Sequence, residues 1–184
     1  MTATPQHSPQ ALSLGRIEPW SPGAALELTS TAIDTAGVIE ARHSALGGNV
    51  SPPLDWNEVE NAGAYALIVE DPDAPREHPF LHWMIWNIRG EVTALEEGLP
   101  NTDRLITPQD SVQGCNDNGS FGYFGPQPPA GTGPHHYHFQ LFALDGPMDL
   151  DPARTDLRTL VDAMKGRVIA DTELVGIFEA PEPS

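Results

Sequence analysis

Residues 71–83 of the chain read DPDAPREHPFLHW, and residues 125–137 read GPQPPAGTGPHHY. Each segment joins a rigid turn of proline and glycine to a strand whose first residues are polar and titratable. Histidine, aspartate and tyrosine at the start of a strand need hydrogen-bond partners once water is excluded, so this layout is costly for packing alone. We interpret the two segments as the two walls of one small anion-binding pocket.

The apolar runs around these segments are short, and each is bounded by Gly, Pro, Asn or Asp. Runs of this kind are typical of strands, so the pattern predicts a mainly β, mainly antiparallel fold. They cover residues 24–28, 38–39, 65–69, 84–88, 139–144 and 174–178.

One segment has the periodicity of an amphipathic helix instead. Its apolar positions at helical spacing are Leu157, Leu160, Val161 and Met164. Thr155 is the expected N-cap of this helix and Gly166 its end. A shorter helical turn is expected at residues 94–97.

The chain has 184 residues, which is enough for one domain that buries roughly 70% of the surface of its unfolded chain. Prolines punctuate the polar start, so residues 1–20 are expected to form an extended, partly disordered arm that wraps the body. Residues 21–184 are expected to form the single domain. The stretch between Pro100 and Pro134 is rich in Gly, Pro and Asn, and its aromatic residues favour an ordered loop with a function.

The chain carries 26 acidic and 9 basic side chains, which gives a formal net charge of -17. Such a charge repels phosphate backbones and anionic leaflets at long range, so a nucleic-acid partner is not expected. An anionic ligand must therefore be captured by local donors, namely backbone N–H groups, imidazoles and a phenol.

Cysteine usage and hydropathy indicate the cellular compartment. Cys115 is the only cysteine, so no intrachain disulfide can form and a reducing compartment fits. We interpret it as a loop thiol without a catalytic role. No apolar run has the length of a membrane-spanning helix, and a cytoplasmic protein is expected.

Strand alternation sorts the histidines of the second segment. His135 and Tyr137 would lie at the rim of a buried face, and His136 and His138 would lie on the opposite face. The apparent histidine cluster therefore splits across the sheet, and no metal site is expected.

The same alternation applied to the first segment groups His82 with Met84, Trp86 and Ile88 on one face. This face also begins with histidine and becomes apolar along the strand. The two strands can then present His82 and His135 toward the same space.

Two turns would supply further groups to this space. Pro72 restricts the directions of Asp71 and Asp73. We expect Asp71 either to accept a hydrogen bond from a histidine, and so to fix its tautomer, or to be itself protonated when a ligand binds. Residues 131–133, which read GTG, could expose backbone N–H groups as an anion nest.

Several motifs follow one another in order over most of the chain. They are NVSPPLDW (49–56), DPDAP (71–75), HW (82–83), NDNGS (116–120), GY (122–123), GP (125–126), PP (128–129), HHY (135–137) and LVG (174–176). Together they resemble the phosphatidylethanolamine-binding protein family, in the bacterial branch often called Raf-kinase-inhibitor-like.

The resemblance implies a Greek-key sandwich of two antiparallel β-sheets with one or two peripheral helices. It also implies a small surface pocket for phosphate, phosphoryl head groups or similar anions, without a cofactor. Carried over motif by motif, the ligand-binding residues are Asp71, His82, Gln127, Pro128, His135 and Tyr137, and the supporting residues are Asp73, Trp83 and Gly131. Family analogy allows a homodimer.

The chain departs from the family's pattern in two places. His136 stands where the family commonly has arginine, and because histidine titrates near neutrality, an ion pair from this position to the Asp-Pro-Asp turn would depend on pH. The segment between Pro75 and His82 is short and lacks the tyrosine of eukaryotic members. This departure counts against a phospholipid head group as ligand, and against kinase inhibition.

The leading hypothesis is a non-enzymatic binding protein for a small anion or phosphoryl ligand. The family analogy adds a regulatory, kinase-inhibitor-like role, against which the second departure counts. The alternative is a hydrolase of small esters or phosphoesters, since an aspartate and two histidines can do acid–base work. No serine nucleophile is evident for these histidines, and no Gly-x-Ser-x-Gly motif occurs. A protein-interaction module with a vestigial pocket is a further alternative.

Overall fold

The computed structural model describes residues 12–17 and 25–181, which fold into two antiparallel sheets and one α-helix. The five-stranded sheet has the order β6 (Val112–Gln113), β4 (Phe80–Arg89), β3 (Ala64–Asp71), β7 (His135–Leu144) and β8 (Val168–Phe178). The three-stranded sheet has the order β1 (Leu28–Thr29), β2 (Leu54–Trp56) and β5 (Ala94–Leu95). The predicted two-sheet, mainly β fold is confirmed.

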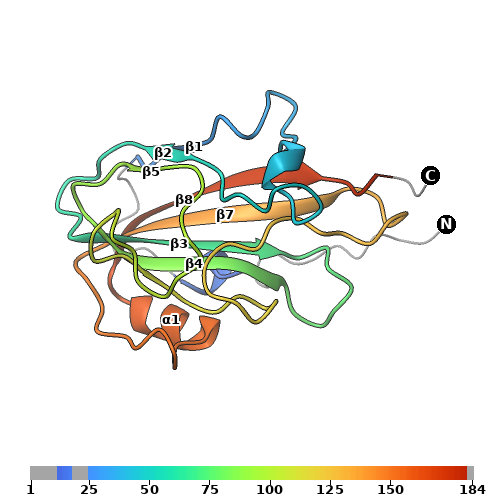
Figure 1. Cartoon of the computed structure of the whole chain (residues 1–184). Helices are drawn as coiled ribbons and strands as arrows, with labels where there is room; N and C mark the ends of the chain where they lie inside the picture. Colours follow the sequence, from blue (N-terminus) through green and yellow to red (C-terminus); the bar gives the residue numbers. More distant parts are fainter. Residues whose placement is uncertain (1–11, 18–24, 182–184) are drawn as a thin grey trace.

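The connections within the five-stranded sheet follow the Greek-key pattern. Strands β3, β4 and β6 are neighbours in chain order, and β7 then returns to pair with β3. The three-stranded sheet covers one face of this sheet, and α1 (Leu157–Met164) lies against the other (Figure 1).

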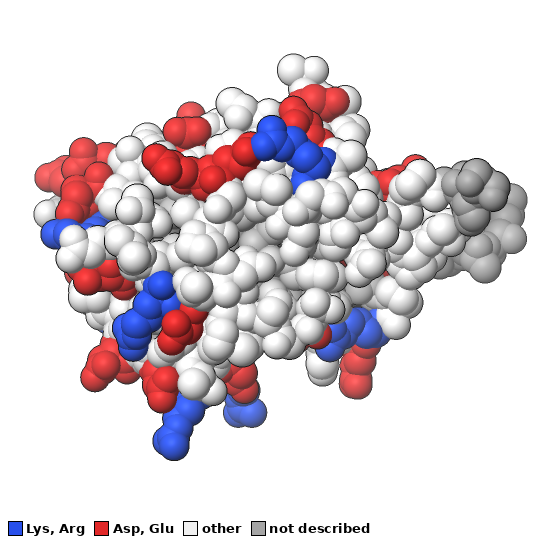
Figure 2. Space-filling view, viewed as in Figure 1, with Lys and Arg blue, Asp and Glu red and all other residues white. Residues whose placement is uncertain are grey.

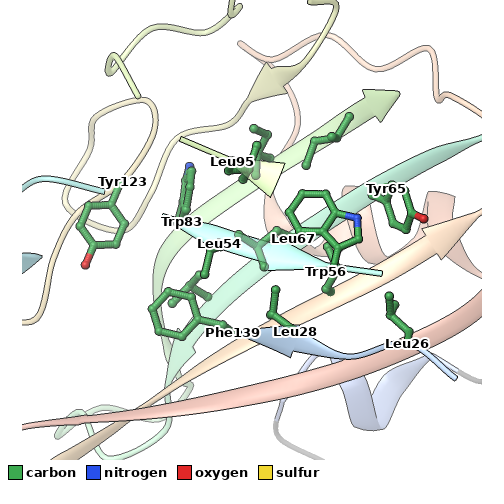
Figure 3. Packing of buried hydrophobic residues seen from close by; sticks show 14 of the residues in the cluster. Leu26, Leu28, Leu54, Trp56, Tyr65, Leu67, Trp83, Leu95, Tyr123 and Phe139 are labelled. Atoms are coloured by element: carbon green, nitrogen blue, oxygen red, sulfur yellow. The ribbon is translucent and has the colours of Figure 1, made fainter. Parts of the chain in front are cut away.

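The central strand β3 is buried along its whole length, because both of its faces are covered. Its odd-numbered residues from Tyr65 to Val69 belong to the same core cluster as Leu54 and Trp56 of the small sheet. Figure 3 shows Tyr65 and Leu67 beside these two residues. Its even-numbered residues pack on the other side, in the cluster that includes the apolar face of α1. The site residues at the ends of β3, β4 and β7 therefore stand on a rigid, doubly covered sheet.

The helix begins one residue later than predicted. Asp156, not Thr155, is its N-cap, since the Asp156 carboxylate accepts a hydrogen bond from the Thr159 N–H at 2.8 Å. The Thr155 hydroxyl instead donates to the carbonyl of Asp151 at 2.7 Å. The helical turn predicted at residues 94–97 is also wrong, because Ala94 and Leu95 form β5 and pair with β2.

A β-bulge in β4 corrects the predicted alternation around His82. Val69 pairs with Trp83 and Glu70 pairs with Leu81, so His82 is the extra residue between the two pairs. The His82 ring lies against Tyr137, 5.0 Å between ring centroids, whereas Met84 belongs to the opposite core. The prediction that His82 shares a face with Met84, Trp86 and Ile88 is therefore wrong.

A second bulge lies further along β4. Tyr65 pairs with Ile88 and Leu67 with Ile85, so two residues of β4 face one residue of β3. Asn87, in this bulge, has a left-handed φ of 57°. Because of this bulge, Ile88 lies in the core between the two sheets, whereas Trp86 lies in the core on the side of α1.

Most of the predicted N-terminal arm lies outside the described residues. Of this arm the structure describes residues 12–17, which include a short 3-10 helix, Leu14–Arg16. The Ser13 N–H donates to Glu70 Oε2 at 2.8 Å, and the Leu14 N–H donates to Gln140 Oε1 at 2.6 Å. This part of the arm is therefore tied to the large sheet, on the same side as α1.

The stretch between Pro100 and Pro134 is held by a buried side chain at its centre. Gln113 accepts the indole N–H of Trp83 at 2.8 Å and donates to the carbonyls of Pro100 and Thr102, each at 2.8 Å. An otherwise irregular segment is thus fixed to β4, as its predicted order requires. Among the described residues, no helix is both long enough and apolar enough to cross a membrane, and the cytoplasmic location stays a prediction.

Candidate functional site

A pocket of about 210 Å³ lies at one end of the five-stranded sheet. The loop after β3 and the loop before β7 form its sides, and both lie at the right-hand end of the molecule in Figure 1. The lining residues are Asp71, Ala74, Pro75, Phe80, His82, Asn118, Phe124, Gln127, Pro128, Pro129 and His135. Segments 71–83 and 125–137 therefore do meet at one pocket.

Asp71 and His135 form a buried pair in this pocket. His135 Nδ1 lies 2.8 Å from Asp71 Oδ2, and each side chain is only 4% exposed. The other carboxylate oxygen, Oδ1, accepts the backbone N–H groups of Asp73 and Ala74 at 2.8 and 3.1 Å. Asp71 is thus an acceptor at both oxygens, and His135 Nδ1 must donate, as predicted.

The other nitrogen of His135 faces Thr132. His135 Nε2 lies 3.1 Å from Thr132 Oγ1, while the Thr132 hydroxyl donates to the carbonyl of Pro129 at 2.7 Å. A hydroxyl has one proton, so the Thr132 oxygen can only accept from His135. Both ring nitrogens of His135 therefore face acceptors, Nδ1 the Asp71 carboxylate and Nε2 the Thr132 oxygen.

His82 has the opposite character. Its Nδ1 lies 2.7 Å from the carbonyl oxygen of Phe124, which can only accept, so Nδ1 carries the ring proton. Burial lowers the pKa of His82 from 6.5 to about 4 and outweighs this hydrogen bond and nearby Asp71, which both raise it. His82 is neutral at physiological pH, and its Nε2 is an acceptor.

Aromatic rings hold His82 in this orientation. The ring stacks on Phe124 with an interplanar angle of 11° and 5.9 Å between centroids. Tyr137 contacts its edge at 5.0 Å, and Phe80 lies 4.7 Å away. The pocket wall on this side is therefore apolar except for one imidazole nitrogen.

The remaining predicted residues take different places. Gln127 and Pro128 line the pocket, whereas Tyr137 is fully buried behind His82, and burial raises the pKa of its hydroxyl. Trp83 faces the core between the sheets and donates to Gln113, away from the pocket. Gly131 lies in the loop before β7 without lining the pocket.

The predicted backbone nest at residues 131–133 is not fully available. The Thr132 N–H donates to the Pro129 carbonyl at 3.3 Å, and the side chain of Thr132, not its backbone, faces His135. Gly131 and Gly133 flank it with left-handed φ values of 79° and 82°, so this loop depends on glycine.

Outside the pocket, His136 pairs with Asp73, as its position relative to the Asp-Pro-Asp turn suggested. Asp73 Oδ2 accepts the His136 backbone N–H at 2.8 Å and faces His136 Nδ1 at 2.7 Å. Partial burial raises the pKa of Asp73, but the hydrogen bonds from His136 outweigh it and lower the pKa below the usual value of 3.8.

His136 and His138 lie on the strand face away from His135, as alternation predicted. His138 Nδ1 lies 3.2 Å from Glu173 of β8. Within residues 12–17 and 25–181, no three His, Cys, Asp or Glu side chains gather closely enough to hold a metal ion.

Several residues of the site were missed from the sequence. Phe80 and Phe124 form its apolar wall, and Asn118 also lines it. The Thr132 hydroxyl hydrogen bonds with Nε2 of His135. Phe124 could have been recognised as a pocket residue, because it directly precedes the Gly125-Pro126 motif. Thr132 could not, because an exposed threonine in a loop gives no sign of a site.

A larger hollow of about 740 Å³ lies between the start of α1 and the start of β4. Its charged lining includes Arg16, Arg76, Arg154, Arg158, Glu70, Asp117 and Asp156. None of the predicted pocket residues lines it, and three of its four arginines are paired with aspartates: Arg76 with Asp117, Arg154 with Asp151 and Arg158 with Asp162. The smaller pocket is therefore the candidate functional site.

Comparison with known proteins gives a consistent result. The family model described as phosphatidylethanolamine-binding protein matches residues 29–179. A UPF0098 protein of Methanothermobacter thermautotrophicus is 42% identical over 154 residues, covering 83% of this chain and 98% of that protein. A UPF0098 protein of Mycobacterium tuberculosis is 36% identical over 178 residues, which cover 94% of this chain and 80% of that protein.

Solved structures agree with the sequence comparison. The Escherichia coli protein YbcL, described as a new member of the mammalian PEBP family, superposes with a TM-score of 0.78 at 32% identity. The match covers 86% of this chain and 100% of YbcL. Relatives from both archaea and bacteria show that the fold is not confined to bacteria.

Proposed function

Because the chain belongs to the phosphatidylethanolamine-binding protein family, we propose that it binds small phosphoryl anions in the pocket between His82 and His135. The observation that carries this proposal is the buried Asp71–His135 pair. It supports a cationic N–H donor at the wall of a small pocket whose other walls are largely apolar. A charged donor in such surroundings binds an anion more strongly than it would in water.

The donors for the anion are few and local. His135 Nε2–H would turn from the exposed Thr132 hydroxyl to a phosphoryl oxygen. Gln127 and Asn118 add side-chain amides that hydrogen bond with no described residue. Phe80, Phe124 and Pro128 would exclude water from these contacts.

The surface charge of the molecule opposes the ligand rather than attracting it. Figure 2 shows acidic side chains around the outline of one face, and the basic side chains visible there lie beside acidic ones. With a net charge of -17, long-range attraction contributes little to anion capture. We therefore expect modest affinity that depends on the pocket donors alone.

A hydrolase is the competing function, because Asp71, His135 and Thr132 follow one another as in a nucleophile relay. The hydrogen bonds argue against this relay. The Thr132 proton is directed to the Pro129 carbonyl at 2.7 Å, so His135 Nε2 is not placed to receive it. Hydrolysis of p-nitrophenyl acetate or p-nitrophenyl phosphate that disappears in both Thr132→Val and His135→Gln would support the enzyme instead.

Isothermal titration with inorganic phosphate and with O-phosphoethanolamine tests the binding function. We expect wild-type protein to bind phosphate, and His135→Gln to bind it at least roughly tenfold more weakly, since a charge-assisted hydrogen bond is worth about 1.5–3 kcal/mol. His136→Gln is the matched control, because its ring lies outside the pocket, and it should bind as wild type does. Absence of phosphate binding by folded wild-type protein overturns the proposal.

A further inference from the structure

The two histidines of the pocket offer opposite hydrogen-bonding groups to a ligand. His135 donates from both ring nitrogens, because Asp71 takes one proton and the Thr132 hydroxyl cannot supply one to the other. His82 donates from Nδ1 to Phe124, which leaves Nε2 as an acceptor. A ligand that contacts both must accept at one end and donate at the other.

The acceptor on His82 is fixed rather than adjustable. Turning the ring over would place a C–H against the Phe124 carbonyl, and moving the proton to Nε2 would place an unprotonated nitrogen there. Either change would break the 2.7 Å hydrogen bond. The contacts with Phe124 and Tyr137 oppose the same movement. His82 Nε2 hydrogen bonds with no described residue, so the pocket side of the ring keeps a free lone pair.

The charge of the pocket points the same way. The positive charge of His135 is matched by the negative charge of Asp71, and no lysine or arginine is among the described residues that line the pocket. A doubly ionised ligand would add negative charge without compensation beside the buried Asp71 carboxylate. A singly charged ligand adds only half as much negative charge beside this carboxylate.

We propose that the pocket selects an oxyanion that still carries a proton, so that one oxygen accepts from His135 while an O–H donates to His82. This inference rests on the proposed function and names its ligand class as the monoanion of a phosphomonoester or of phosphate. Sulfate and sulfate esters have no such proton near neutral pH and would place a charged oxygen against the His82 lone pair. Leaving this buried acceptor unsatisfied should weaken binding by roughly tenfold or more.

Monomethyl phosphate and monomethyl sulfate test the proposal, because they have nearly the same shape and differ in the proton. Monomethyl phosphate loses its second proton at about pH 6, whereas monomethyl sulfate does not titrate in this range. We expect titration calorimetry to give roughly tenfold tighter binding of the phosphate ester at about pH 5.5 than at about pH 7.5. The sulfate ester should bind more weakly than the phosphate ester at the lower pH.

The sulfate ester also corrects for titration of the protein. Asp71, His135, Tyr137 and Asp117 face or surround His82, and any change in their ionisation affects both esters. The ratio of the two affinities therefore reports the ligand's proton. His82→Gln, whose amide can donate as well as accept, should bring this ratio toward one, whereas His136→Gln should leave it unchanged.

The outcomes separate the inference from the proposed function. Equal binding of both esters at both pH values overturns the selection for a protonated anion and leaves anion binding standing. Failure of the folded protein to bind either ester or inorganic phosphate overturns both.

Discussion

The imidazole of His135 and the carboxylate of Asp71 lie 2.8 Å apart, and both are almost completely buried. The pair joins the start of β7 to the end of β3, 64 residues away in the chain. It also fixes the turn after β3, through the two backbone N–H groups that Asp71 accepts. The same contact therefore holds the two loops of the pocket together and orients its main donor.

Replacing Asp71 by asparagine should destabilise the protein by about 3 kcal/mol, because breaking a buried pair leaves His135 without its counter-charge. The side-chain carbonyl of the asparagine would still accept the N–H groups of Asp73 and Ala74, so the turn itself should survive. Urea unfolding at neutral pH measures the loss. Asp73→Asn is the control and should cost about 1 kcal/mol or less, since the side chain of its partner His136 is 47% exposed. Equal losses in the two variants would contradict this account.

The Asp73–His136 pair should make stability depend on pH on the acid side. The pKa of Asp73 is lower in the folded chain than its ordinary value of 3.8, so the unfolded chain binds more protons as the pH falls. Its contribution is present above the unfolded pKa and is lost as the pH falls through the folded pKa. The difference in unfolding free energy between wild type and Asp73→Asn should be full at about pH 6, begin to fall at about pH 4 and close only below the folded pKa of Asp73.

His136→Arg separates the two partners of this pair. Arginine stays charged at every accessible pH, whereas histidine side chains lose their charge near neutrality. The variant should therefore gain stability over wild type more at about pH 8 than at about pH 5. A gain that is the same at both pH values would show that the charge of His136 does not matter.

The alternation of β7 could be predicted because it is local. Tyr137 and Phe139 fall on one face and His138 and Gln140 on the other, and this strand continues without interruption through ten residues. The place of His82 could not be predicted, because a bulge is a property of the pairing between β3 and β4 and leaves no mark in one strand. The cap at Asp156 was missed for a different reason: Thr155 and Asp156 are both good capping residues, and the sequence does not choose between them.

Thr132 should compete with the ligand for His135. Its hydroxyl accepts from His135 Nε2 in the unliganded pocket, so Thr132→Val should raise the affinity for phosphate by up to roughly tenfold, the worth of one hydrogen bond. Thr132→Ser keeps the hydroxyl and should leave the affinity unchanged. Titration calorimetry of the three proteins gives the comparison. Weaker binding by the Val variant would mean that the hydroxyl is itself a ligand for the anion.

The buried carboxylate of Glu70 makes the first turn of the described chain important for stability. Glu70 Oε2 accepts only the Ser13 N–H and the Gln140 amide among the described residues, each at 2.8 Å, and Oε1 has no partner there. Deleting residues 1–17 would remove one of these two donors and leave a buried charge poorly compensated, at a cost of about 3 kcal/mol or more. The same deletion also removes apolar contacts of Ile17, which do not depend on Glu70.

A double-mutant cycle with Glu70→Met isolates the carboxylate: the deletion should cost at least about 1 kcal/mol less in the Met background, measured by urea unfolding. Additivity within about 0.5 kcal/mol would show that the Ser13 hydrogen bond does not stabilise the buried carboxylate.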